Sequence, residues 1–219
     1  RAAEPVELDV RTEPTGGVRA TATILFPVEP AIIQRLLTDY AHWPELFDVR
    51  MRMAEVREQD GKAFTDIRID HALLPGERRL LSETRILPTG GLLTELKGGD
   101  FKQYRRFWKL IPIDGGAYTK AEFELLVEVD TIVPDWMVAL AMRRDLESHF
   151  RIMREKALAQ AQRDFDRTHV ARLRQHAPHR QNSVRLRVTN AHAVVNDRPH
   201  LAVEEFIGIR NFFFQRRRD

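Results

Sequence analysis

Hydrophobic and polar residues alternate with the period of a β-strand along the first part of the chain. Between residues 18 and 26 every second residue is apolar, which is typical of a strand with one buried face. Pro30 then opens an apolar stripe of helical period that continues to about Thr38. Pro44 starts a second apolar piece that is long enough for one or two turns. The pattern therefore predicts one strand followed by two short helices.

Six further alternating segments follow, separated by glycine, proline and aspartate turn signals. Their connections are short enough for hairpins, so we expect an antiparallel meander rather than parallel strands joined by helices. The predicted strands lie near residues 49–59, 62–71, 78–87, 91–97, 101–112 and 117–129. With the first strand they make a curved antiparallel sheet of about seven strands.

After Pro134 the apolar period changes from two to between three and four. This stripe predicts a long helix of about seven or eight turns, which would cover the apolar face of the sheet. Its members are Met142, Leu146, Phe150, Met153, Ala157 and Ala161. The predicted fold class is thus α+β, a curved antiparallel sheet with two short helices and a long C-terminal helix.

The charge is unevenly distributed along the chain. Residues 165–219 carry eleven arginines against five acidic residues, whereas the rest carries 24 basic against 27 acidic residues. We therefore expect an N-terminal strand or extension over 1–17, one domain over 18–164, and a basic, partly disordered tail over 165–219. Truncation after about Gln162 should leave the domain folded.

The composition excludes several classes of protein. Hydrophobic residues make up 43% and charged residues 31%, and no apolar run reaches the roughly 20 residues that span a bilayer. Cysteine is absent, which excludes disulfides, thiolate metal sites and cysteine nucleophiles. The first residues, Arg-Ala-Ala-Glu-Pro, fit the junction left by a removed leader, so export to the periplasm is favoured over a cytoplasmic location.

Two sequence motifs carry a family resemblance. Residues 37–47, Leu-Thr-Asp-Tyr-Ala-His-Trp-Pro-Glu-Leu-Phe, resemble the Leu-x-Asp-Tyr-x-x-Trp-Pro-x-Phe signature of bacterial polyketide cyclase/dehydrase-like proteins. Residues 107–119 resemble their Trp-x-Leu-x-Pro-x-Gly-Gly-Thr hairpin, with Ala-Tyr-Thr where Thr-x-Val is commoner. The chain is identified on these grounds as similar to the START-like (SRPBCC, polyketide cyclase/dehydrase and lipid-transport) superfamily, with its helix-grip fold.

The resemblance implies a hydrophobic cavity between the sheet and the long helix. Its candidate ligand-binding residues are Tyr104, Arg106, Trp108, Phe123, Ile67, Ile69, His71, Met142, Leu146, Phe150 and Met153. Trp108, Phe123, Phe150, Met142 and Met153 are bulky, so they could instead fill much of this space themselves.

No group of residues has the pattern of a catalytic or metal site. His42 lies between Asp39 and Glu45, but the better interpretation is a helix connection in which Asp39 caps and Trp43 enters the core. His71 either faces the cavity or closes a strand. Ser82 and Ser148 lack the context of an activated nucleophile, and the Gly-Gly pairs are turns rather than phosphate loops. We expect no catalytic residue, no metal and no cofactor.

Three functions follow from this interpretation. The first, which we prefer, is non-enzymatic binding or transport of an apolar small molecule, that is, lipid binding or the binding of an isoprenoid or quinone. The second is a polyketide aromatase/cyclase in which Tyr104 or His71 moves a proton. The third is an interaction module whose cavity is filled by its own side chains.

The tail adds a possible partner surface. Clustered arginines beside aromatic residues suit contact with a membrane surface, whereas nucleic acid is disfavoured. The residues concerned are Phe212, Phe213, Phe214, Arg216, Arg217 and Arg218.

Arg106 carries a separate expectation. Strand parity places it on the same face as Tyr104 and Trp108, so it enters the cavity if Trp108 does. A buried guanidinium must then meet the polar head of a ligand or a carboxylate such as that of Glu83 or Glu95, unless a bulge turns it outward.

Overall fold

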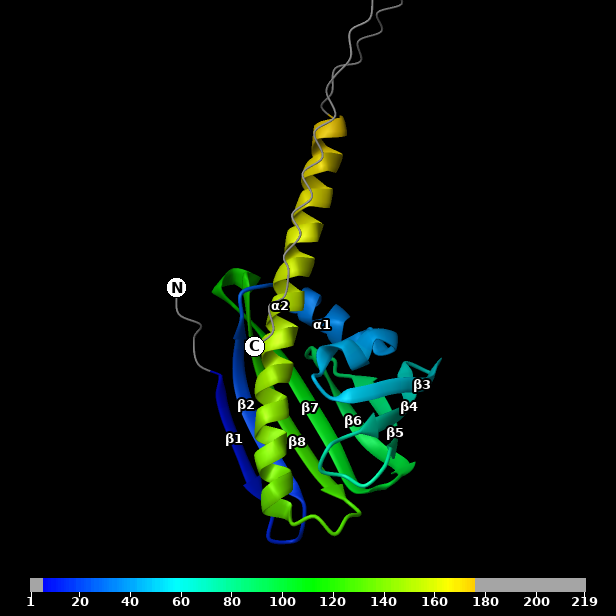
Figure 1. Cartoon of the computed structure of the whole chain (residues 1–219). Helices are drawn as coiled ribbons and strands as arrows, with labels where there is room; N and C mark the ends of the chain where they lie inside the picture. Colours follow the sequence, from blue (N-terminus) through cyan, green and yellow to red (C-terminus); the bar gives the residue numbers. More distant parts are fainter. Residues whose placement is uncertain (1–5, 176–219) are drawn as a thin grey trace, which may run out of the picture. The chain divides into compact units, whose positions relative to one another are not determined.

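A single antiparallel sheet curves around a long helix in the computed structural model, which describes residues 6–175 (Figure 1). The strand order is β1-β2-β8-β7-β6-β5-β4-β3, so only the pair β2 and β8 joins strands distant in sequence. The strands are β1 (Glu7–Thr12), β2 (Val18–Phe26), β3 (Arg50–Gln59), β4 (Lys62–Asp70), β5 (Arg78–Ile86), β6 (Gly91–Gly99), β7 (Phe101–Ile113) and β8 (Tyr118–Val129). The helix-grip α+β fold is confirmed, with eight strands rather than about seven.

The added strand is β1, which falls in the segment expected to be a strand or an extension. Its Leu8 and Val10 pack on the core while Glu7, Asp9 and Arg11 alternate with them. This alternation is only six residues long, which makes it weak in the sequence but sufficient for pairing with β2.

Two short helices lie between β2 and β3, as predicted. Helix α1 (Pro30–Thr38) begins with proline in its first turn and buries Ile32, Ile33 and Leu37. The 3-10 helix η1 (Tyr40–Leu46) buries Trp43, whose indole N–H donates to the carbonyl of Leu37 at 2.8 Å. A further one-turn 3-10 helix, η2 (Asp114–Gly116), joins β7 to β8.

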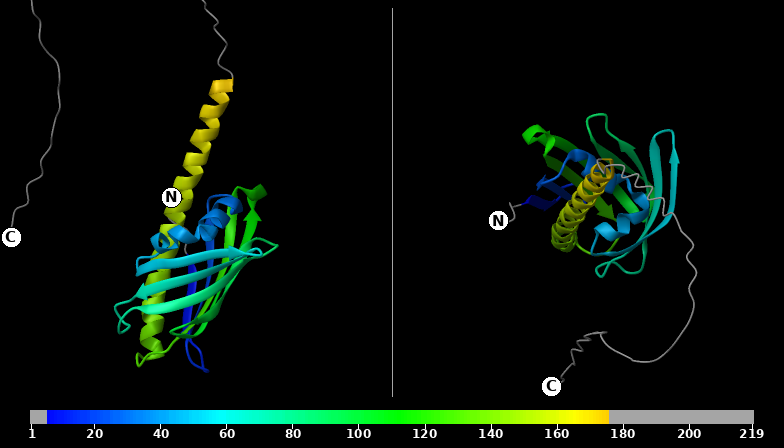
Figure 2. Two further views of the ribbon diagram at one scale, coloured as in Figure 1. Left: turned by 90° about the vertical axis from the view of Figure 1, so that its right-hand side faces the viewer. Right: turned by 90° about the horizontal axis from the view of Figure 1, so that it is seen from above.

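Helix α2 (Asp135–Gln175) runs across the concave side of the sheet (Figures 1 and 2). It buries Leu146, Phe150, Met153 and Ala157, which confirms the predicted helical phase. It contacts β1 and β2, α1 and η1, whereas β3 and β4 curl away on the other side (Figure 2). At 41 residues it is longer than the predicted seven or eight turns, and its last part extends beyond the sheet (Figure 1).

Backbone geometry at Gly91 fixes how β6 packs beside β7. Its φ of +93° is one that residues with a Cβ rarely adopt, and a Cβ there would lie 2.1 Å from the carbonyl oxygen of Trp108. The Gly91 N–H donates to the side-chain oxygen of Gln34 at 2.8 Å, which ties α1 to this hairpin. This hydrogen bond attaches the start of β6 to α1.

No helix in the described segment is both long enough and apolar enough to cross a membrane.

Candidate functional site

An open groove of about 1000 Å³ lies between the start of α2 and two loops of the sheet. The first loop follows η1, and the second follows β4. Its apolar lining consists of Val49, Ala72, Leu73, Trp136, Met137, Leu140 and Ala141. Its polar lining consists of Asp48, Arg50, Asp70, His71, Arg144, Asp145 and Ser148. A groove with this mixture suits a ligand that is mainly apolar with a polar part.

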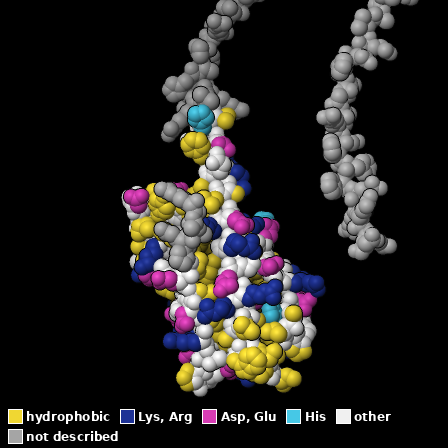
Figure 3. All heavy atoms as spheres, turned by 60° about the vertical axis from the view of Figure 1, so that its left-hand side comes forward, with side chains coloured by type: hydrophobic (Ala, Val, Ile, Leu, Met, Phe, Trp, Pro, Cys, Tyr) yellow, Lys and Arg dark blue, Asp and Glu magenta, His cyan; other side chains and the backbone are white. Residues whose placement is uncertain are grey.

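The apolar side of the groove continues onto the surface at the start of α2. Trp136 and Leu140 are 64% and 66% exposed, and Ile132 in the preceding loop is 97% exposed. Hydrophobic side chains gather at this end of the molecule (Figure 3). Large apolar side chains left exposed beside a groove are typical of a binding site rather than of core packing.

His71 joins the β4 loop to α2 across the groove. Its Nε2 lies 3.2 Å from Asp145 Oδ2, and its Nδ1 accepts a hydrogen bond from the Leu73 N–H at 3.2 Å. The hydrogen bond to Asp145 raises the pKa of His71 above its ordinary value. Both ring nitrogens are therefore engaged by the protein.

Aromatic rings fill the interior beneath the middle of α2. Trp108 lies 4.7 Å from Phe123 and 5.9 Å from Phe150 between ring centroids, the latter edge to face. His149 stacks on Phe47 at 4.1 Å, and its Nδ1 donates to the carbonyl of Leu46 at 2.7 Å. Complete burial lowers the pKa of His149 to about 3, so this ring is neutral and structural at ordinary pH.

Arg106 is buried on the concave face, 5% exposed, as strand parity predicted. Its guanidinium lies 4.0 Å from the ring of Trp43, and one nitrogen reaches the Thr94 hydroxyl at 3.5 Å. No carboxylate between residues 6 and 175 pairs with it, and its Nε has no hydrogen-bond partner there. The guanidinium thus lies in the interior without a counter-charge.

The two alternatives considered for Arg106 are wrong. It is not turned outward by a bulge, since the register of β7 with β6 and β8 is regular at this position. Glu83 instead pairs with Lys62 and Lys97 on the outer face, and Glu95 pairs with Arg85.

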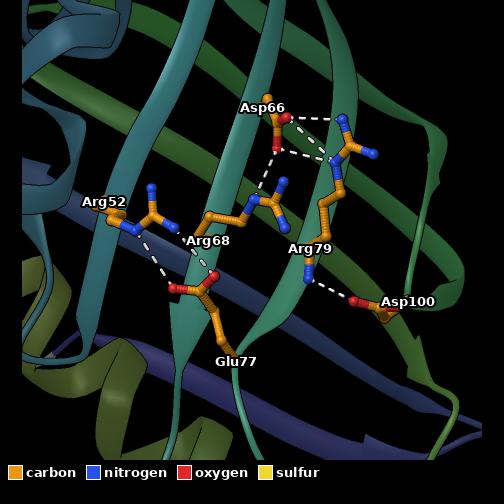
Figure 4. A network of polar contacts seen from close by, with 6 residues as sticks. All are labelled: Arg52, Asp66, Arg68, Glu77, Arg79 and Asp100. Carbon is orange, nitrogen blue, oxygen red and sulfur yellow. Dashed lines mark hydrogen bonds and ion pairs between the residues drawn. The ribbon is translucent and has the colours of Figure 1, made fainter.

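The buried carboxylate of Asp66, by contrast, is compensated. On the outer face Asp66 accepts hydrogen bonds from Arg79 at 2.8 to 3.2 Å and lies 3.4 Å from Arg68 (Figure 4). The hydrogen bond from Arg79 lowers the pKa of Asp66, and Arg52 pairs with Glu77 beside it. This network joins β3, β4 and β5 on the outer face of the sheet.

The remaining predicted cavity residues divide by depth. Ile67, Leu146 and Met153 are buried, and Ile69, Tyr104 and Met142 are partly buried against the core. Within the described chain, His71 is the one predicted cavity residue that also lines the open groove. Contact of the other residues with a ligand stays a prediction.

His42 and its acidic neighbours form no site of their own. His42 Nδ1 lies 2.7 Å from Asp39 at the surface, so the Asp39 carboxylate bonds this ring instead of capping a helix N–H as expected. Glu45 pairs with Lys156. No group of three or more potential metal ligands occurs in the described part of the chain.

The chain matches a known family over most of the domain. The matched family is described as polyketide cyclase / dehydrase and lipid transport, and the match covers residues 26–154. The chain belongs to this family. A comparison with curated protein sequences gave no significant match.

Several solved structures of other proteins are similar to this fold. A Thermus thermophilus protein has a TM-score of 0.55 and 20% identity, with 65% of this chain and 98% of that chain covered. A STAR-related lipid transfer protein from Xanthomonas axonopodis has a TM-score of 0.54 and 12% identity, with 72% of this chain and 96% of that chain covered. The Zhui aromatase/cyclase from a Streptomyces species has a TM-score of 0.50 and 11% identity, with 71% of this chain and 95% of that chain covered.

Sequence reasoning missed most of the groove lining in this family member. Trp136 and Leu140 do not belong to the buried stripe of α2. Their large apolar side chains on the exposed side of the helix start were the signal in the sequence that could have indicated the groove. The loop residues around Asp48 and Ala72 gave no signal, because their positions depend on how the hairpins curl. The tail residues from Phe212 to Arg218 lie outside the described residues.

Proposed function

We propose that this protein binds or carries an apolar small molecule, a lipid, isoprenoid or quinone, without transforming it. The observation that supports this most is the groove of about 1000 Å³, half of whose lining residues are apolar, beside the start of α2. Space of this size is in the range that holds a small ligand, which favours a binder over a module whose cavity its own side chains fill. The aromatic rings around Trp108 occupy the deeper interior but leave this groove open.

The second candidate is a polyketide cyclase. It would need a proton-transferring group, and the histidine that Asp145 contacts in the groove, His71, is the residue to consider. A histidine that moves a substrate proton needs one ring nitrogen free to reach the substrate. Here the Nδ1 that Asp145 does not contact already accepts the Leu73 N–H. This arrangement supports His71 as a tether between loop and helix, and so favours the carrier.

The proposal is tested by ligand capture. An organic extract of the purified full chain, analysed by mass spectrometry, should contain a stoichiometric apolar compound. The neutral dye phenylnaphthylamine should also bind and raise the melting temperature. An empty extract together with no dye binding would refute the proposal.

A pair of variants locates the bound molecule. Ala141→Trp places a large ring in the groove and should weaken dye binding at least about tenfold, since it removes space that the ligand needs. Ala159→Trp, at an exposed position of the same helix, should leave binding unchanged. Equal dye affinities of the two variants would show that the dye does not bind in the groove.

A further inference from the structure

Five buried side-chain nitrogens of the described chain have no hydrogen-bond acceptor, and two of them lie together on the concave face of β7. Arg106 Nε and Trp108 Nε1 are both buried, and neither has a partner among the described residues. They belong to the same face of β7, two residues apart, and Trp108 is fully buried. Buried donors are normally satisfied, so these two neighbouring donors, one of them charged, suit an acceptor on a bound molecule.

The charge of Arg106 narrows the chemistry of that acceptor. A guanidinium stays protonated when buried, so its positive charge is permanent. Its contacts are the Trp43 ring at 4.0 Å and the Thr94 hydroxyl at 3.5 Å, the second at the limit of a hydrogen bond. Neither contact carries a negative charge, and such contacts offset only part of the cost of removing the guanidinium from water.

The buried groups around Arg106 offer no alternative anion, and Glu58, whose charge acts on the neighbouring Tyr40, is exposed. Tyr40 is nearby, but burial raises the pKa of its hydroxyl, so it stays neutral at ordinary pH. His149 is neutral, and the positive charge of Arg106 contributes to its lowered pKa. The neighbouring hydroxyls of Thr84 and Thr94 bond each other at 2.9 Å. Among the described residues, Arg106 therefore has no buried anionic partner.

The open groove lies close to this interior. Asp48 and Ser148 line the groove, and the next residues toward the core, Phe47 and His149, carry the stacked rings. His149 also lies 6.2 Å from Trp108 between ring centroids. His149 thus links a residue of the groove lining to Trp108, and the charge of Arg106 acts on the same histidine.

We propose that the bound molecule carries an anionic oxygen group, of the carboxylate kind, and that Arg106 receives this group with Trp108 as a second donor. This inference rests on the proposed function, and it names the class of ligand. The apolar body of the molecule lies in the groove, and its anionic end replaces the missing counter-charge of Arg106.

The test compares two dyes of the same skeleton on the full chain. Anilinonaphthalene sulfonate is anionic, whereas phenylnaphthylamine is its neutral parent. The wild-type protein should bind the anionic dye at least about tenfold more tightly, as expected for a charge-assisted hydrogen bond in a desolvated site. Equal affinity for the two dyes overturns the inference alone, and binding of neither dye overturns the proposed function as well.

Variants assign the preference to Arg106. Arg106→Gln should abolish the preference for the anionic dye while the affinity for the neutral dye stays within about twofold, and Arg106→Lys should retain part of the preference because it keeps the charge. The matched control is Arg105→Gln, at a neighbouring arginine that is exposed and pairs with Glu124 on the outer face. An unchanged preference in Arg106→Gln overturns the inference. If that variant fails to fold by near-ultraviolet circular dichroism, the wild-type comparison and Arg106→Lys decide.

Discussion

Charged side chains of the sheet differ in how their charge is balanced. Asp66 and Arg79 form a multiply hydrogen-bonded pair on the outer face, whereas Arg106 has a ring and a hydroxyl but no anion. Removing one member of a buried ion pair is costly because it leaves the other charge alone. Arg106 is in that state already, so its replacement by an uncharged residue should leave the fold as stable or more stable.

Phe150 is the residue whose loss should cost most stability. It is 1% exposed and meets Phe123 and Trp108 edge to face. We predict that Phe150→Ala lowers the free energy of unfolding by about 3–5 kcal/mol, measured by denaturant titration. The control is Phe165→Ala on the same helix, where the ring is 66% exposed and the change should stay near about 0.5 kcal/mol. A loss below about 1 kcal/mol in Phe150→Ala would contradict the packing described.

His149 should make the protein less stable in acid. Its pKa falls from 6.5 to about 3 on folding, so between these values the unfolded chain binds a proton that the folded chain does not. The free energy of unfolding therefore decreases as the pH falls through this window, by up to about 1.4 kcal/mol per pH unit. His71 and His42, whose pKa values are raised, act in the opposite direction.

His149→Gln isolates this effect, because glutamine can still donate to the Leu46 carbonyl but does not titrate. Between about pH 7 and about pH 5 the wild type should lose about 2 kcal/mol more stability than the variant, measured by urea unfolding at both values. Parallel pH dependence of the two proteins would mean that His149 is not the buried titrating group.

Sequence predicted the position of a single residue correctly where that position depends on one strand or helix alone. The two-residue period of β7 placed Arg106 and Trp108 on one face, and the structure shows that this face is the buried one. The partner of Arg106 was not predictable, because Trp43 comes from η1 and reaches it only through the packing of the short helices on the sheet. Periodicity gives the face of a residue, and tertiary packing gives its neighbour.

At the scale of elements, the hairpins depend on glycine at close backbone approaches. Gly91→Ala should lower the free energy of unfolding by more than about 2 kcal/mol, since its Cβ would overlap the Trp108 carbonyl and its φ is +93°. Gly61→Ala is the matched control, with a φ of +72° and open space around it, and should cost about 1 kcal/mol. Thermal and denaturant unfolding of both variants measure the difference, and equal costs would contradict a steric origin.

The elements were predicted nearly to their ends where turn residues mark them, and less well where no such residue occurs. Strands β3 to β8 lie within two residues of the predicted limits because glycine, proline and aspartate punctuate the chain. Helix α2 was predicted too short, because its apolar stripe fades while helix formation continues. Pairs such as Gln160 with Asp164 and Gln162 with Asp166 support this part, and no proline or glycine interrupts it before Gln175.

At the scale of the whole molecule, the domain should fold without the end of the chain. Phe165 and Val170 are 66% and 47% exposed, and this part of α2 extends beyond the sheet (Figure 1). A chain that ends at Asp166 should retain its free energy of unfolding to within about 1 kcal/mol, because it keeps the surface ion pair of Arg35 with Asp164. A loss of more than about 2 kcal/mol would show that later residues stabilise the domain.

The open sheet has a consequence for how copies of this protein behave at high concentration. Strands β1 and β3 form the two edges, and each presents backbone groups that a strand of another molecule could pair with. On β3 a bulge between Met53 and Glu55 interrupts the regular register, and charged side chains, among them Arg57 and Glu58, follow it along the strand. Irregularity and charge of this kind disfavour edge-to-edge association, so the same strand that borders the sheet also protects the protein against aggregation.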